Sequence, residues 1–169
     1  MIQELRVPRA RVAVLLRHQQ ALEKATGTTL RVQKDGGVDV QGDVEHLLVA
    51  VNLVKAIGRG FSYPSALTLL EEDAQLAVIA VDGTEKTVRR LMSRVIGRRG
   101  LAKKNIERFS GAKLCVYGKT VAILGPPGSV HMAATAVDDL LGGRKHTFVW
   151  AKLEKMKRLA DEEADQDDI

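Results

Sequence analysis

The sequence repeats itself at a fixed spacing, and this duplication constrains the fold more than any other feature. The segment TGTTLRV at Thr26–Val32 parallels SGAKLCV at Ser110–Val116, 84 positions further along. A helical pattern with an apolar stripe precedes each copy, and a glycine-bearing turn, a short alternating strand and an amphipathic helix follow it. A repeat of this length indicates two copies of one small folding unit.

Each copy also has an opening strand, at Gln3–Val7 in the first and Leu76–Asp82 in the second. The expected order is therefore strand, helix, loop, helix, strand, strand, helix. This order predicts an α+β fold in which each unit packs a three-stranded antiparallel sheet against helices. A further helix is expected over His146–Ala160, followed by a disordered acidic tail over Asp161–Ile169. The predicted divisions are residues 1–73, 74–145 and 146–169.

Charge is distributed unevenly along the chain. The formal net charge is +5, yet the last nine residues hold six acids and no base. Residues 89–119 carry ten lysines and arginines and one acid, Glu107. A one-signed segment of this kind raises a positive potential that suits a phosphate backbone.

At the centre of this segment, two glycines three positions apart interrupt a helical pattern in Gly97-Arg98-Arg99-Gly100. Glycine lets the backbone turn sharply and approach a bound strand closely. The helix that follows begins with unpaired N–H groups and a partial positive charge, where phosphate binds readily. A P-loop would continue with Lys-Ser/Thr, and a dinucleotide fingerprint needs a third glycine. Neither pattern is present, so we interpret the segment as a backbone clamp for single-stranded RNA.

These residues also carry a family resemblance. Residues 76–141 resemble a type I KH domain, with Arg94–Gly100 as its RVIGxxG signature. The whole chain is similar to archaeal tandem-KH members of the Partner of Nob family, which are small-subunit ribosome biogenesis factors. The closer match is carried by Ala56–Phe61, Arg94–Gly100, Val116–Ile123 and the arrangement of the C-terminal helix. The resemblance implies two type I KH-like units of βααββα order.

By this resemblance, a groove between the loop and the second strand of the unit would hold roughly four unpaired nucleotides. The expected RNA-binding residues belong to the signature, the following helix and that strand: Arg94, Val95, Ile96, Gly97, Arg98, Arg99, Gly100, Leu101, Lys103, Lys104, Lys113 and Leu114. The loop would contact the sugar-phosphate path, and Lys113 would reach a base edge or a phosphate. The apolar members would form the floor under the bases, with ordinary core as the alternative for Val95, Ile96 and Leu114.

The first unit departs from this pattern. Where its loop is expected, the sequence reads Arg17-His18-Gln19-Gln20-Ala21, without glycine and about three residues shorter than a complete KH loop. Such a segment cannot grip a phosphate backbone in the usual way. We therefore interpret the first unit as a structural or partner-binding copy.

Other classes of function find little support in the sequence. No nucleophile with a base, catalytic carboxylate pair or metal-ligand spacing is present, so no enzyme, cofactor, metal or small-molecule substrate is expected. No run approaches the roughly 18 apolar residues of a membrane helix, and no secretory leader is recognisable, so a cytoplasmic protein without a membrane partner is expected.

The partners implied by the resemblance are single-stranded small-subunit rRNA near its 3′ end, a Nob-type endonuclease and a translation initiation factor. Two alternative functions remain open. One is a protein-interaction scaffold that has lost RNA binding, and the other is a KH adaptor in RNA decay.

Overall fold

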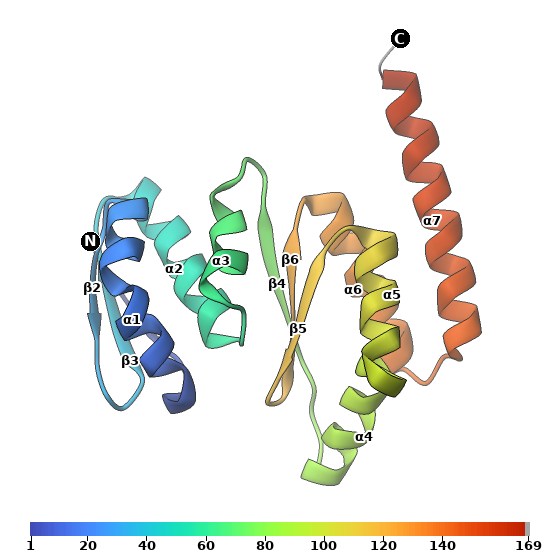
Figure 1. Cartoon of the computed structure of the whole chain (residues 1–169), viewed down its shortest axis with the longest axis horizontal. Helices are drawn as coiled ribbons and strands as arrows, with labels where there is room; N and C mark the ends of the chain where they lie inside the picture. The colour runs from blue at the N-terminus through green and yellow to red at the C-terminus, as the bar shows by residue number, and fades with distance from the viewer. Residues whose placement is uncertain (168–169) are drawn as a thin grey trace. The chain divides into compact units, whose positions relative to one another are not determined.

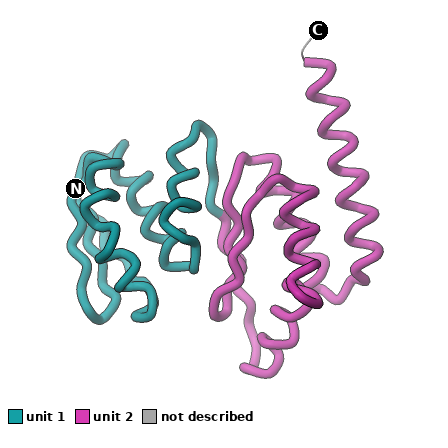
Figure 2. The backbone as a smooth tube through the Cα atoms, viewed as in Figure 1, with its two compact units in different colours: residues 1–76 teal, residues 77–169 magenta. Residues whose placement is uncertain are grey.

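The computed structural model describes residues 1–167, and its contacts divide the chain into two compact units. The first unit is Met1–Leu76, and the second begins at Ala77 (Figure 2). Each unit holds a three-stranded antiparallel sheet with helices, and a long helix ends the second. The predicted α+β fold class is therefore confirmed.

The first unit packs α1 and α2 against one face of its sheet (Figure 1). Its elements are β1 (Ile2–Arg6), α1 (Arg9–Thr26), β2 (Thr29–Val32), β3 (Gly37–Gln41), α2 (Val44–Gly58), α3 (Tyr63–Ala66) and the short 3-10 helix η1 (Leu67–Leu70). The strand order is β1-β3-β2, with β3 paired to both neighbours in antiparallel register. Val38 and Val40 alternate along β3 and are buried in the core, as the two-residue period of a strand requires.

The second unit has the same strand arrangement, β4-β6-β5, with α4, α5 and α6 on one face of the sheet (Figure 1). Its elements are β4 (Gln75–Ala80), α4 (Glu85–Ile96), the 3-10 turn η2 (Arg98–Gly100), α5 (Leu101–Ser110), β5 (Lys113–Tyr117), β6 (Thr120–Gly125), α6 (Pro127–Leu141) and α7 (His146–Asp167). The central strand β6 is buried from Thr120 to Leu124, and the alternate residues Val121 and Ile123 belong to the core of this unit.

One arginine in each unit binds the carboxyl end of that unit's α2 or α6 helix. Arg11 Nε donates to the Ile57 carbonyl at 2.8 Å, and Arg94 Nε donates to the Leu140 carbonyl at 2.9 Å. A second nitrogen of each guanidinium donates to a carbonyl four residues further on. The two sets are offset by the same 83 positions. We call Arg11 and Arg94 the helix-end arginines.

Further hydrogen bonds repeat between the units. The Glu23 carboxylate accepts from the Leu30 N–H at 2.7 Å, and the Glu107 carboxylate accepts from the Leu114 N–H at 3.4 Å. These two bonds are offset by 84 positions, against 83 for the helix-end arginines. The duplication seen in the sequence is therefore a duplication of contacts.

The first unit lacks the expected loop altogether. Helix α1 runs unbroken over 18 residues, so the expected helix–loop–helix order is wrong there. Val7 and Val81 are equivalent positions, because each donates its N–H to a carbonyl in the hairpin turn of its unit. Val7 lies four positions before Arg11, whereas Val81 lies thirteen positions before Arg94. Gly27, which ends α1, lies sixteen positions after Arg11, and Gly111, which ends α5, lies seventeen positions after Arg94. The expected shortfall of three residues in the loop is therefore wrong, because nearly all missing residues precede Arg11.

The C-terminal helix is longer than expected. α7 continues to Asp167, so the disorder expected from residue 161 onward is wrong as far as 167; residues 168 and 169 lie outside the described part of the chain. Val149 and Leu153 anchor the helix in the core, and Lys152 pairs with Asp139 at 2.9 Å. Once a helix is anchored, adding alanine and glutamate costs little, because nucleation is already complete. Within residues 1–167, no helix is both long enough and apolar enough to cross a bilayer.

Replacing Arg11 with alanine should destabilise the first unit by about 2–3 kcal/mol, because the carbonyls of Ile57 in α2 and of Phe61 beyond it lose a charged donor. Amide hydrogen exchange in α2 measures the loss. Arg17→Ala is the matched control, since Arg17 is exposed on the same helix, and it should change stability by less than about 0.5 kcal/mol. Equal effects of the two substitutions would contradict this role.

Candidate nucleic-acid interface

The loop between α4 and α5 has an unusual backbone. Helix α4 ends where Gly97 adopts φ 73° and ψ 177°, a region open almost only to glycine. Arg99 and Gly100 are also left-handed, with φ 54° and 73°. The Gly97 N–H donates to the Ser93 carbonyl at 2.8 Å, and the Gly100 N–H donates to the Gly97 carbonyl at 3.2 Å. Three of the four loop residues therefore have a positive φ.

The two glycines have different surroundings. A Cβ on Gly97 would lie 2.5 Å from the Cβ of Ala102, so this glycine packs tightly against the first turn of α5. A Cβ on Gly100 would meet no atom within 4 Å. Gly97 therefore fixes the angle between the helices, while Gly100 leaves the outer side of the loop bare and open to close approach.

Positive charge at the loop is uncompensated. Arg98 and Arg99 are exposed, and neither has an ion-pair partner among residues 1–167. No side chain caps the N-terminus of α5, so its first N–H groups are available to an anion. Lys104 and Lys113 are exposed as well, whereas Lys103 pairs with Glu107 at 3.4 Å. Of the expected cations, Lys103 is therefore the one that an acid partly neutralises.

Arg94, expected to contact RNA, has its guanidinium engaged within the unit. Its guanidinium is taken up by the carbonyls of Leu140 and Arg144, and its own carbonyl accepts a hydrogen bond from His146 Nε2 at 2.9 Å. Its counterpart Arg11 makes the same two bonds in a unit that has no loop. Arg94 therefore fixes the last turns of α4, the helix that leads into the loop.

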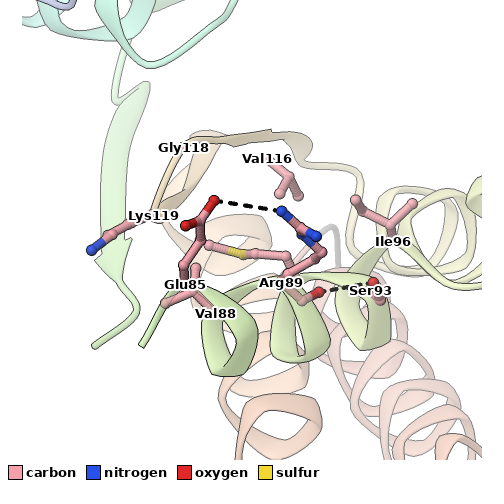
Figure 3. Close-up of a pocket in the computed structure, with 9 residues that line it drawn as sticks. Glu85, Val88, Arg89, Ser93, Ile96, Val116, Gly118 and Lys119 are labelled. Carbon is pink, nitrogen blue, oxygen red and sulfur yellow. Dashed lines mark hydrogen bonds and ion pairs between the residues drawn. The ribbon is translucent and has the colours of Figure 1, made fainter. Parts of the chain in front are cut away.

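A groove of about 400 Å³ lies between α4 and the hairpin of β5 and β6 (Figure 3). Its lining is apolar at the base and charged at the rim: Glu85, Val88, Arg89, Met92, Ser93, Ile96, Val116, Gly118 and Lys119. Figure 3 shows Arg89 and Ile96 extending from α4 toward the strand that carries Val116. Arg89 pairs with Glu85 at 3.5 Å, an exposed contact of little strength. The groove can therefore accept flat apolar groups beside a polyanion.

The expected apolar floor is only partly present. Ile96 is 37% exposed and lines the groove, but Val95 and Leu114 are 0% and 3% exposed and belong to the core, the alternative stated for them. Leu101 is exposed but does not line this groove. Sequence reasoning missed Val116, although strand alternation places it on the same face as Leu114. Arg89 and Lys119 were also missed as rim residues.

Within residues 1–167, no three histidine, cysteine or acidic side chains gather in a way that could hold a metal ion.

Known proteins match this chain over most of its length. The profile of the second KH domain of PNO1, a eukaryotic-type KH domain (KH-domain type I), matches residues 73–158. A KH domain-containing protein of Methanocaldococcus jannaschii is 36% identical across 93% of this chain and 74% of its own length. The RNA-binding protein pno1 of Dictyostelium discoideum is 25% identical across 90% and 70%.

A solved structure also has the same fold throughout. One chain in the crystal structure of an a/eIF2alpha–aDim2p–rRNA complex from Pyrococcus horikoshii OT3 is 34% identical, covers 94% of each chain and gives a TM-score of 0.86.

The two loop glycines should differ in their tolerance of a side chain. Gly97→Ala should lower the free energy of unfolding by about 3–5 kcal/mol, because it combines a glycine-only backbone with a steric clash. Gly100→Ala should cost about 1–2 kcal/mol, since only the left-handed backbone resists it. Urea denaturation of both variants measures the difference. A larger loss for Gly100→Ala would refute the assigned geometry.

Proposed function

The chain belongs to the PNO1/Dim2 family of KH-domain proteins, and from this membership we propose that it is an assembly factor of the small ribosomal subunit that holds single-stranded rRNA through its second unit. The observation that carries this proposal is the loop Gly97–Gly100, where two arginines without acidic partners among residues 1–167 precede the uncapped N-terminus of α5, near an apolar groove. The protein acts by binding, and no catalytic step is assigned to it.

In this mechanism the strand follows the loop with its backbone and the groove with its bases. The arginines and the first N–H groups of α5 bind phosphates, and Gly100 lets the sugar-phosphate chain come close. Roughly four nucleotides would be held. Their bases would lie against Ile96 and Val116, with Lys119 and Arg89 at the rim. Lys104 and Lys113 would extend the attraction along the strand.

The proposed RNA is small-subunit rRNA near its 3′ end, and the proposed protein partners are a translation initiation factor and a Nob-type endonuclease. The presence of a/eIF2alpha and rRNA in the complex of the Pyrococcus relative supports the first two. We assign RNA binding to residues 74–145 and a supporting or partner-binding role to residues 1–73, with 146–169 as an extension. Ribosome assembly of this kind would take place in the cytoplasm.

Two other functions compete with this one. A protein-interaction scaffold would have no need for Arg98 and Arg99, which lack acidic partners among residues 1–167. A KH adaptor in RNA decay would use the same clamp on other RNAs. The RNA recovered with the protein from cells separates assembly from decay, and enrichment of small-subunit rRNA supports assembly.

Reversing both loop charges should weaken RNA binding. For randomised eight-nucleotide single-stranded RNA, Arg98→Asp/Arg99→Asp should lose at least about tenfold in affinity. The slope of log K against log salt concentration should be shallower for the variant than for the wild type by about 1.4, the value for two lost phosphate contacts on a single strand. Fluorescence anisotropy measures both quantities.

The matched control is Arg17→Asp/Lys24→Asp, which makes the same change in net charge at exposed positions of α1, in the unit that lacks the loop. It should keep its affinity within about threefold, because salt screens the effect of charges that do not contact the RNA. An equal loss in both variants would mean that RNA responds to overall charge and not to the loop.

A further inference from the structure

A second hollow, of about 530 Å³, lies on the other flank of the loop. Its walls come from the end of α4, the loop, α5 and the start of α7: Ser93, Arg94, Gly97, Arg98, Leu101, Ala102, Asn105, His146 and Trp150. Ser93 alone lines both this hollow and the groove described above. The last turn of α4, at Ser93, therefore lies between the two hollows, and the loop residues Gly97 and Arg98 line the second.

Helix α7 packs beside α5 (Figure 1) and contributes two aromatic rings, those of His146 and Trp150, to the hollow. Val149 and Leu153 are buried in the core, which leaves the neighbouring Trp150 half-buried at its edge. His146 is fixed through its bond to the Arg94 carbonyl, and its ring lies 5.9 Å from that of Trp150. The indole is thus set beside the loop on a helix that cannot easily move away.

The remaining lining residues add three kinds of contact. Leu101, the residue directly after the loop, is 55% exposed and supplies an apolar surface. Asn105, one turn further along α5, supplies an amide that can both donate and accept hydrogen bonds. Arg98 supplies a guanidinium without an acidic partner among residues 1–167.

We propose that this hollow holds one further base of the RNA, adjacent to the nucleotides held in the groove. A nucleotide is the ligand that needs an aromatic surface for its base, an amide for the base edge and a cation for its phosphate. No carboxylate lines the hollow, so a phosphate can approach it. Arg98 borders both the backbone path and the hollow, which makes the site continuous with the clamp.

This inference rests on the proposed function, because the loop must first bind RNA. It predicts that the bound strand is longer than the roughly four nucleotides of a KH groove. Loss of one stacked base should weaken binding about tenfold.

The test compares randomised single-stranded RNAs of four and eight nucleotides on the full chain. Trp150 is its only tryptophan, so emission excited at 295 nm reports the hollow directly. Eight nucleotides should quench Trp150 and bind about tenfold more tightly than four, which should quench it little. Trp150→Leu and Asn105→Ala, followed by anisotropy, should remove the gain from length and leave four-nucleotide binding unchanged. Phe148→Leu is the control, because Phe148 is an exposed aromatic on α7 outside this hollow.

Several outcomes would overturn the inference while the clamp stands. These are equal affinity for the two lengths, unchanged Trp150 emission at saturation, or full eight-nucleotide affinity in both variants. Equal losses for both lengths in both variants would also overturn it, since they would indicate a structural effect. If the wild-type protein binds neither RNA, the proposed function itself fails, and this inference fails with it.

Discussion

Two hydrogen bonds from one arginine to the carboxyl end of a helix are the constraint on which each unit depends. Arg11 binds the carbonyls of Ile57 in α2 and Phe61 beyond it, and Arg94 makes the equivalent bonds at α6. The bonds persist in the first unit, which has no loop, so they serve the fold and not the ligand. Carbonyls at a helix end lack intrahelical donors, and a planar guanidinium can satisfy two at once.

In the second unit the same bonds determine where the loop begins. Arg94 lies three residues before Gly97, so fixing the last turns of α4 fixes the point at which the backbone reverses. Gly97 then packs against Ala102 and directs α5 away at a set angle. The free N–H groups of α5 and the backbone that carries the two arginines are therefore fixed before any ligand arrives. A preorganised backbone of this kind loses little entropy on binding a strand.

Much of this could be predicted from the sequence, because local spacing encodes it. The duplication, the fold class and the loop all follow from glycines, charges and apolar periods. The role of Arg94 could not be predicted, since its partners are backbone carbonyls 46 and 50 positions away that carry no sequence signal. Strand alternation placed Leu114 and Val116 on one face but could not show which position remains open. The sequence did not predict the unbroken helix α1, because the position of the residues missing from the first unit can be found only by matching hydrogen bonds between the two units.

We propose that the second unit binds RNA, whereas the first unit keeps the sheet and helices of the fold without an RNA-binding loop. Amide chemical shifts recorded during titration with single-stranded RNA test it most directly. The largest shifts should fall on Gly97–Gly100, Ile96 and Val116, and the amides of α1 should stay unchanged. Shifts of equal size along α1, or none at the loop, would contradict the account.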